Sequence, residues 1–370
     1  MDSLITKVFD LIKDYRSDER DPSVMVTEGN IKRWVNQFDE HDRTFLLDEL
    51  THIFSKRYIS KDRAKSFLRK LIIKLSSDGS YNTIQDFLSH TIFLDLQPKG
   101  KSQKVLLKIL KEIIEQEYSF DFTLCGSKSK TNNVYIDDIL ATGNTLFQDI
   151  KKWVGQEFST GLTNLEALQR NNTKLFFSFI FIHEKNLKNK GKEFGIKIEK
   201  DFDTRYTTIY GCMIDNKMDS ESKYEFVIPV ESGQPDFVLE YNKEIEQNVD
   251  KYTENYQNKP QSSFYRNEIT PKIETLFSSS ENRIRFENLM LSSGIQILKG
   301  SNNIKKNIRA LGYSLPSHKD FGFGTLCFTW RNVPNNTPLT FWYSDNNYPL
   351  FTAKKGNTLT LPEILSEYGL

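Results

Sequence analysis

The chain has 370 residues, enough for two domains or for one large domain with appendages. Its 50 Lys and Arg residues balance 49 Asp and Glu residues, so no overall charge indicates binding to nucleic acid or to a membrane surface. The longest apolar run, 175–182, is too short to span a bilayer, and residues 1–20 lack the apolar core of a signal peptide. The three cysteines have no metal-binding spacing, so we expect a cytoplasmic protein with reduced thiols.

Residues 1–88 are predicted to form a helical domain. Short helices with short connections resemble a winged-helix domain or a similar bundle, and apolar periodicity does not choose between them. The expected helices are 1–15, a helix capped by Thr27 that continues through Val35, a helix that starts near Asp42, and a helix over 61–75 capped by Ser60.

The helix at 61–75 has a basic face that permits two interpretations. Against a single acidic residue, Asp62, it carries Lys61, Arg63, Lys65, Arg69, Lys70 and Lys74. Such a face could contact nucleic acid or an acidic partner. The alternative, which we favour, is a solvated face opposite the apolar residues of the same helix, because charged exposed helix faces are common.

From residue 90 onward the pattern changes to alternating strands and helices. The predicted strands are 91–96, 120–125, 133–137, 175–182 and 207–212, and the predicted helices are 102–116 and a segment that begins at about Asn144. Alternation of this kind indicates an α/β fold with a parallel sheet covered on both faces, whose ligands bind at the carboxyl ends of the strands. We therefore expect an α/β core at 89–235, followed by an extension at 236–370 that packs on the core.

The most informative stretch is 134–145, Val-Tyr-Ile-Asp-Asp-Ile-Leu-Ala-Thr-Gly-Asn-Thr. An apolar strand ends on two carboxylates, a turn of small residues follows, and a helix begins behind the turn. The free amides and the dipole of a first helical turn favour an anion, whereas two carboxylates suit hydroxyls or a hard cation. A phosphate beside hydroxyls and Mg²⁺ describes a ribose 5-phosphate. The alternative is that Asp137 and Asp138 are solvated residues at a strand end.

Residues 137–145 resemble the phosphoribosyl-pyrophosphate loop of type I phosphoribosyltransferases. That pattern is an acid, Asp, two apolar residues, two small residues, Gly, any residue and Thr, and every position matches. The resemblance implies that Asp137 and Asp138 are the catalytic acids and bind the ribose hydroxyls, directly or through Mg²⁺. It also implies that the 5-phosphate is held by Ala141, Thr142, Gly143, Asn144 and Thr145. Because successive strand residues face opposite ways, both acids reach one ligand only if the chain turns immediately after Asp137.

The segment 97–103 follows the first predicted strand of the sheet, where phosphoribosyltransferases have a pyrophosphate-binding loop. Glycine lets backbone amides approach a diphosphate, and basic or hydroxyl side chains add donors. The residues that the resemblance assigns to this loop are Lys99, Gly100, Lys101 and Ser102. Taken alone, the segment would be an ordinary basic loop between a strand and a helix.

The C-terminal part carries two aromatic-rich stretches, 325–330 and 339–343, on either side of an Asn-Val-Pro-Asn-Asn sequence. Their alternation predicts a β-hairpin with one buried face. This ending, the helical N-terminus and the sheet together resemble phosphoribosyltransferase-like proteins of bacterial conflict systems, which occur beside anti-phage modules and some retron reverse transcriptases. The resemblance implies an effector of antiviral defence, with a reverse transcriptase or another defence protein as a partner.

The connection at 126–132 is shorter than the mobile catalytic loop of many phosphoribosyltransferases. Lys128 and Lys130 could reach a phosphate from it, and 251–263 or the turn at 332–336 could supply a lid instead. His183 and Glu184, at a predicted strand end, are a candidate acid/base pair, although such pairs are more often only a strand end. The sequence therefore supports an enzyme that acts at the anomeric carbon or, alternatively, a non-catalytic nucleotide sensor that regulates a partner.

Overall fold

The computed structural model describes residues 1–218, 223–257, 262–301, 305, 307–345 and 347–352. The chain divides into two compact units. One combines Met1–Ser60 with the described residues from Asp215 onward, and the other comprises Lys61–Ile214. These boundaries differ from the expected ranges 1–88, 89–235 and 236–370, because residues 61–88 belong with the sheet and the earlier helices belong with the C-terminal part.

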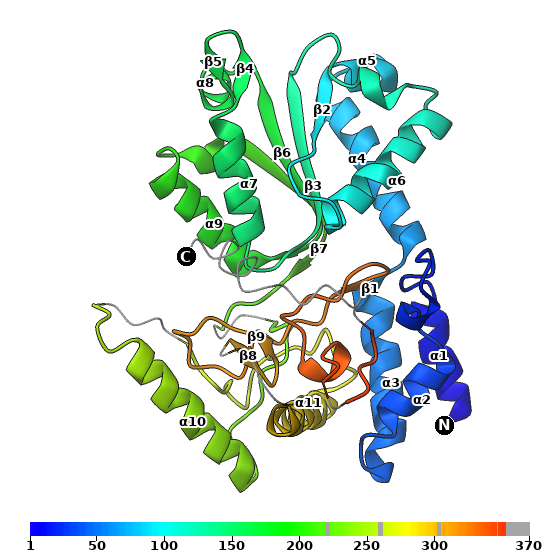
Figure 1. The fold of residues 1–370 in the computed structure, drawn as a ribbon, viewed down its shortest axis with the longest axis vertical. Helices are drawn as coiled ribbons and strands as arrows, with labels where there is room; N and C mark the ends of the chain where they lie inside the picture. Colours follow the sequence, from blue (N-terminus) through cyan, green and yellow to red (C-terminus); the bar gives the residue numbers. More distant parts are fainter. Residues whose placement is uncertain (219–222, 258–261, 302–304, 306, 346, 353–370) are drawn as a thin grey trace. The chain divides into compact units, whose positions relative to one another are not determined.

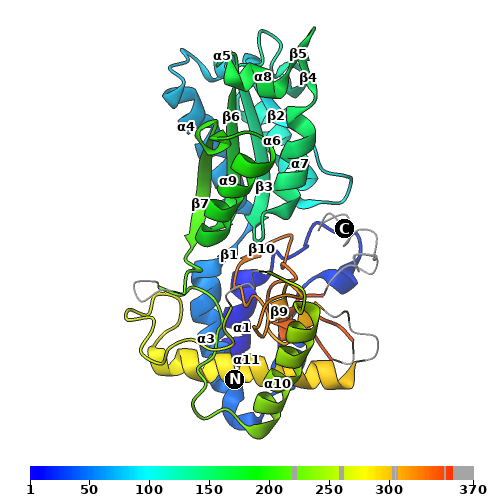
Figure 2. The ribbon, with the colours of Figure 1, turned by 90° about the vertical axis from the view of Figure 1, so that its left-hand side faces the viewer.

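The unit Lys61–Ile214 is built on a sheet of four parallel strands in the order β2-β3-β6-β7, which run side by side in both ribbon views (Figures 1 and 2). The mixed α/β class and the parallel sheet predicted from the sequence are thereby confirmed. Helices α4 and α6 cover one face of the sheet and α7 and α9 the other (Figure 1). The strands are β2 (Thr91–Leu94), β3 (Asn132–Leu140), β6 (Lys174–His183) and β7 (Tyr206–Ile214). The other elements are α4 (Lys61–Asp78), α5 (Ile84–Ser89), α6 (Ser102–Glu117), η2 (Phe122–Leu124), α7 (Asn144–Val154), β4 (Glu157–Ser159), β5 (Leu162–Thr163), α8 (Asn164–Gln169), α9 (Glu184–Lys197) and η3 (Phe202–Thr204).

Two segments of this unit differ from the prediction. The strand expected at 120–125 is the short 3₁₀ helix η2, because the Asp121 side chain accepts hydrogen bonds from the amide (2.8 Å) and the hydroxyl (2.7 Å) of Thr123 and closes a turn. Strand β3 continues past its predicted end at Asp137, since Leu140 still pairs with Ile182 of β6. Both acids of the motif therefore lie within a strand.

The second unit packs three N-terminal helices against the C-terminal part of the chain. The indole Nε1 of Trp34, in α2, donates to the backbone carbonyl of Thr340 at 2.8 Å, and both residues are buried. Thr27 caps α2 in a capping box, as its position predicts. The elements are α1 (Asp2–Ile12), η1 (Pro22–Val24), α2 (Glu28–Val35), α3 (Glu40–Arg57), β1 (Tyr58–Ile59), α10 (Asp236–Tyr252), α11 (Ser280–Gly300), β8 (Ile308–Arg309), β9 (Gly312–Tyr313), β10 (Phe328–Thr329) and η4 (Leu339–Phe341).

Two expectations for this unit are not met. Residues 1–88, all of which are described, contain a single strand, β1, and it pairs in parallel with β10. They therefore lack the antiparallel wing of a winged-helix domain. The predicted hairpin of 325–330 with 339–343 is also wrong, because all of 325–330 is buried and 339–341 forms the helix η4 after Pro338. Aromatic alternation in this segment reflects a chain enclosed on all sides and not a half-buried hairpin.

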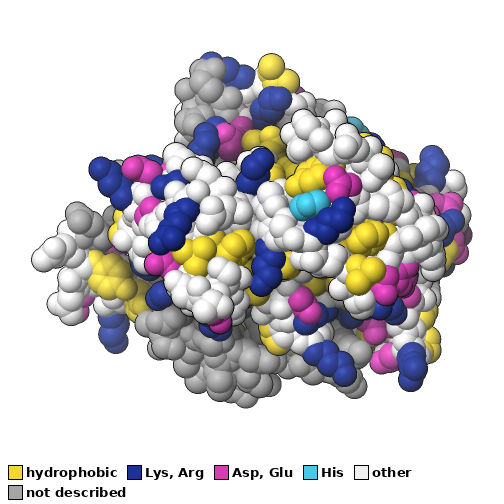
Figure 3. Space-filling view, turned by 90° about the horizontal axis from the view of Figure 1, so that it is seen from above, with side chains coloured by type: hydrophobic (Ala, Val, Ile, Leu, Met, Phe, Trp, Pro, Cys, Tyr) yellow, Lys and Arg dark blue, Asp and Glu magenta, His cyan; other side chains and the backbone are white. Residues whose placement is uncertain are grey.

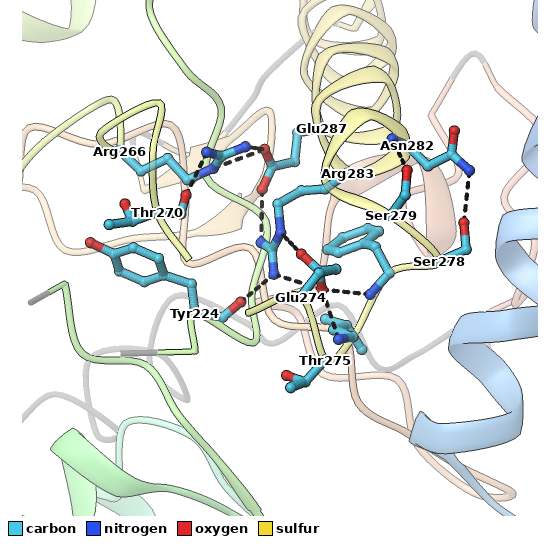
Figure 4. A network of polar contacts seen from close by, with 12 residues as sticks. Tyr224, Arg266, Thr270, Glu274, Thr275, Ser278, Ser279, Asn282, Arg283 and Glu287 are labelled. Atoms are coloured by element: carbon cyan, nitrogen blue, oxygen red, sulfur yellow. Dashed lines mark hydrogen bonds and ion pairs between the residues drawn. The ribbon is translucent and has the colours of Figure 1, made fainter. Parts of the chain in front are cut away.

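A buried ion network lies at the centre of the same unit (Figure 4). Glu287 of α11 accepts hydrogen bonds from Arg283 at 3.1 Å and from Arg266 at 2.8 Å. Arg283 also binds Glu274, and all four side chains are almost fully buried. Two positive and two negative charges thus cancel inside the protein, which is the condition under which buried charges are tolerated.

Candidate functional site

Three segments named by the sequence motif meet at one edge of the sheet, where β2 and β3 end. The loop 95–101 follows β2, the acids lie near the end of β3, and the turn 141–143 leads into α7. Because neighbouring parallel strands end at the same edge, the loop and the turn are brought together there. Helices α6 and α7 both begin at this edge, so two helix N-termini face the same region.

Asp137 is buried, with both carboxylate oxygens engaged by hydrogen-bond donors. Its Oδ1 accepts from the hydroxyl of Ser102 at 2.6 Å and from the amide of Asp138 at 2.9 Å. Its Oδ2 accepts from the Gln97 side chain at 2.7 Å. The structure thus brings Ser102, predicted as a phosphate contact, directly onto a predicted catalytic acid.

The Gln97 amide extends this contact into a buried polar network. Its Nε2 also donates to the Tyr135 hydroxyl at 2.7 Å, and that hydroxyl donates to Asp149 of α7 at 2.9 Å. Burial raises the pKa of Asp137, against the lowering effect of its hydrogen bonds, and burial raises the pKa of Asp149 as well. Asp137 and Asp149, both with raised pKa, are therefore linked through the Gln97 amide and the Tyr135 hydroxyl.

Asp138 contacts Asp137, although successive residues of a regular strand point to opposite faces and β3 continues through both acids to Leu140. The Asp138 side chain forms a hydrogen bond with Asp137 that lowers the pKa of Asp137. Asp138 Oδ1 accepts from the amide of Ile139 at 2.8 Å, and the residue is buried. β3, which is described in full, has no turn directly after Asp137, so the two acids meet within the strand.

The loop after β2 is held in place by Gln103, which the sequence analysis did not identify. Its side-chain oxygen accepts from the amides of Leu96 and Gln97, both at 2.9 Å, and its nitrogen donates to the carbonyl of Ile136 at 3.2 Å. A buried amide with three backbone partners fixes the loop to β3. Gly100 has a φ of 98°, a conformation that favours glycine. Lys99 and Gly100 are exposed, and Lys101 is partly exposed at the N-cap of α6.

The turn 141–145 has the backbone of an anion site. Gly143 is the N-cap of α7 in the left-handed region, with φ 74°, and no side chain caps this helix. The Asn144 amide lies 3.4 Å from the Thr142 hydroxyl, and the Asn144 side-chain nitrogen is a buried donor without a hydrogen-bond partner. Ala141, Thr142 and Thr145 are partly buried around them. The first turn of α7 therefore keeps donors for an anion.

One face of α9 supports this turn. His183 Nδ1 donates to the carbonyl of Leu140 at 2.9 Å, and the Asn186 side chain donates to the carbonyl of Ala141 at 2.6 Å. The aliphatic stem of Lys190 lies so close to Gly143 that a Cβ there would be 2.6 Å from Lys190 Cγ. His183, Asn186 and Lys190 follow the helical spacing i, i+3, i+7, which is the signal in the sequence that could have identified them. Fully buried against a carbonyl, His183 positions the turn.

Of the segments expected to cover the site, 126–131 lies at the opposite end of the strands, and 332–336 and the described part of 251–263 belong to the other unit. The connection 126–131 precedes β3, so Lys128 and Lys130 lie at the amino ends of the strands, and Lys128 pairs with Asp86 at 3.2 Å. Asp137 lies five residues beyond the start of β3, about 17 Å along the strand, which separates them from the acids. In the other unit, the backbone carbonyl of Asn336 accepts from Thr325 at 3.1 Å, and Asn336 is buried. The turn at 332–336 is thus part of the core of that unit.

The basic face of α4 is partly neutralised. Arg69 forms a two-pronged ion pair with Glu117 of α6, with a shortest distance of 2.7 Å, and Lys74 pairs with Asp78 at 2.9 Å. Figure 3 draws one face of the molecule, on which basic and acidic side chains are interspersed. Nucleic acid as a partner remains a hypothesis, and the contacts favour a solvated face.

Charge reversal on α4 distinguishes these interpretations. If α4 contacts nucleic acid, Arg69→Glu with Lys70→Glu should reduce association, and wild-type binding should fall steeply with added salt. If the face is only solvated, which we expect, the wild type shows no salt-sensitive binding to single- or double-stranded nucleic acid in an electrophoretic shift assay. Lys111→Glu, on α6, is a control for a general change of charge.

One protein-family model matches most of the chain. A family described as PRTase-CE matches residues 31–352, most of the sequence. The chain belongs to this family. It is therefore a phosphoribosyltransferase-like protein, as the motif at 137–145 predicts. Comparisons with curated proteins and with solved structures gave no match. Within the described residues, no helix combines the length and the apolar character needed to cross a bilayer.

Proposed function

We propose that this PRTase-CE protein binds phosphoribosyl pyrophosphate or a related nucleotide and transfers or cleaves at the anomeric carbon of the ribose. The observation that carries the proposal is the position of the motif. Its turn forms the uncapped N-terminus of α7, and Asp137 lies at the same sheet edge beside the start of α6. The defence role, with a reverse transcriptase or another defence protein as a partner in the cytoplasm, rests on the resemblance to bacterial conflict proteins.

Each part of the ligand has a place in this proposal. The 5-phosphate binds the amides and hydroxyls of 142–145, where the helix dipole favours negative charge. The ribose hydroxyls bind the acid pair, Asp137 and Asp138, whose side chains contact each other. The diphosphate binds Lys99, Gly100 and Lys101. The positive charges of the two lysines stabilise the charge that develops as the bond from C1 to the diphosphate breaks.

Magnesium belongs to the same proposal, with the ligand as its main binding partner. Asp137 already accepts three hydrogen bonds, which leaves little capacity for a cation. Mg²⁺ binds readily through substrate phosphates, waters and one or two carboxylates, and Asp137 and Asp138 supply at most two. Of the described residues, only Asp39, His41 and Asp42 form a cluster of three such ligands, and they lie in the other unit.

The rival function is a nucleotide sensor without turnover. One observation favours it, the absence of a lid among 126–131. Incubation of the purified protein with phosphoribosyl pyrophosphate and with nucleotides, with and without Mg²⁺, separates the two functions. Release of diphosphate or free base supports the enzyme. Stoichiometric binding without product supports the sensor, and no binding at all contradicts both.

The phosphate turn can be tested on its own. Thr142→Ala with Thr145→Ala should weaken binding of ribose 5-phosphate by about 1–3 kcal/mol, because hydrogen bonds from hydroxyls to a charged group are lost. Isothermal titration calorimetry measures this change. Thr163→Ala, on a cap of α8 in the same unit, is the control and should leave affinity unchanged. Equal affinity of the double variant and the wild type would place the phosphate elsewhere.

A further inference from the structure

We propose that Ser102 makes the site selective for ligands that carry a diphosphate, by capping Asp137 until a diphosphate displaces its hydroxyl. This inference rests on the proposed function and deepens it. Ser102 belongs to two parts of the site at once. It is the first residue of α6, directly after the loop assigned to the diphosphate, and its hydroxyl lies 2.6 Å from Asp137 Oδ1.

The physical basis is that a serine hydroxyl has one proton. It can donate to the carboxylate of Asp137 or to an oxygen of a diphosphate, but not to both. An ionised Asp137 has no proton, so it cannot in turn donate a hydrogen bond to the Ser102 oxygen. A diphosphate at the start of α6 therefore competes directly with Asp137 for the Ser102 hydroxyl, and a diphosphate contact with that hydroxyl removes one of the two hydrogen bonds that Asp137 Oδ1 accepts.

Ser102 is the movable partner of Asp137. The Asp138 side chain, which also hydrogen-bonds Asp137, is buried. Gln97, which donates to Asp137, is buried as well and is bound to Tyr135 and, through its backbone amide, to Gln103. Ser102 is partly exposed, and its rotation needs no backbone movement. Since Asp137 is only 7% exposed, a ribose hydroxyl can approach Oδ1 once the Ser102 side chain turns away.

This arrangement predicts how the site ranks its ligands. Ribose 5-phosphate has no diphosphate to accept a hydrogen bond from Ser102. The ribose hydroxyls must therefore compete with the existing charge-assisted hydrogen bond between Ser102 and Asp137. Phosphoribosyl pyrophosphate brings its own acceptor for Ser102 and meets an uncapped Asp137. The preference for the diphosphate ligand would thus arise from one side chain that serves both halves of the site.

The test compares the two ligands on Ser102 variants by titration calorimetry with Mg²⁺. Ser102→Ala should bind ribose 5-phosphate about tenfold more tightly than the wild type does, the equivalent of one hydrogen bond, and should not bind phosphoribosyl pyrophosphate more tightly. Ser102→Thr keeps the hydroxyl and should behave as the wild type. Ser102→Gly also lacks the hydroxyl and should repeat the alanine result, which guards against a local packing effect.

Two outcomes would overturn the inference in distinguishable ways. Unchanged or weaker binding of ribose 5-phosphate by both Ser102→Ala and Ser102→Gly, with the wild-type preference retained, would mean that Ser102 is no cap while the proposed function stands. Absence of binding of either ligand to the wild type and to all three variants would overturn the proposed function and this inference with it.

Discussion

Replacing Asp137 and Asp138 together with asparagine should abolish turnover of a phosphoribosyl ligand and leave the fold intact. Both side chains keep their size, and asparagine can still accept the hydrogen bonds from Ser102 and the Asp138 amide at Oδ1. What is lost is the acceptor of the Gln97 amide at Oδ2 and the negative charge at the point where the ribose and Mg²⁺ are proposed to bind. We expect product release to fall below detection, because the transition state loses its electrostatic complement.

The control for this variant is Asp95→Asn, which removes an exposed carboxylate directly after β2, in the same loop. Asp95 pairs with Lys104 of α6 at 2.5 Å. It should retain activity. Full turnover by the double variant would remove the acid pair from the chemistry and leave the turn at 141–145 as a binding feature only.

Asp137→Asn alone makes a prediction about how stability depends on pH. Burial raises the pKa of Asp137 in the folded protein, so the folded state holds this proton more tightly than the unfolded chain does. Stability conferred by the protonated group is full below the ordinary carboxyl pKa and is lost as pH rises through the raised value. Asp137→Asn removes this loss, so its melting temperature should gain on the wild type as pH rises. A difference that is constant with pH would contradict the burial effect.

Local chemistry explains what could be predicted from the sequence. The end of a strand, the glycine turn and the start of α7 depend on neighbouring residues, and Gly143 has the left-handed conformation that its position requires. The capping box at Thr27 is equally local. The bond between Ser102 and Asp137 could not be predicted, because it depends on how β2 and β3 align side by side. The supporting face of α9 depends in the same way on β6.

The errors have a common physical origin. Alternating apolar residues predict a half-buried strand only if the residues between them face water. At 325–330 the intervening residues Cys327 and Thr329 are fully buried as well, so alternation carried no information about faces. Local sequence patterns also could not predict how the chain divides into two units. Trp34 binds Thr340 across more than 300 residues of sequence, and no composition change marks that contact.

The buried ion network yields the second large effect, on stability. Arg283→Ala should lower the free energy of unfolding of its unit by about 3–5 kcal/mol, because it leaves buried carboxylates without their partner. All five donors of the Arg283 guanidinium are used. They reach Glu274 with two bonds, Glu287 with one, and the carbonyls of Tyr224 and Phe226.

The geometry also predicts that charge alone does not rescue the network. Arg283→Lys keeps the positive charge but offers three donors from one point, which cannot reach two carboxylates and two carbonyls. It should therefore lose most of the same stability. The control is Arg285→Ala on the same helix, whose partly exposed guanidinium binds Asp42 at 2.6 Å and should cost about 1 kcal/mol or less. Urea unfolding followed by circular dichroism measures all three variants.

The deficit of Arg283→Ala should depend on pH in a defined direction. Burial already raises the pKa of Glu287, against the lowering effect of Arg283 and Arg266. Removal of Arg283 takes away one of these opposing charges, so the pKa of Glu287 rises further in the folded variant. Protonation then relieves the cost of the unpaired carboxylate as pH falls towards the ordinary glutamate value. The variant should consequently be closest to the wild type in mildly acidic solution and furthest from it at pH 8. An equal deficit at both pH values would mean that Arg283 acts through its bonds to the backbone carbonyls and not through Glu287.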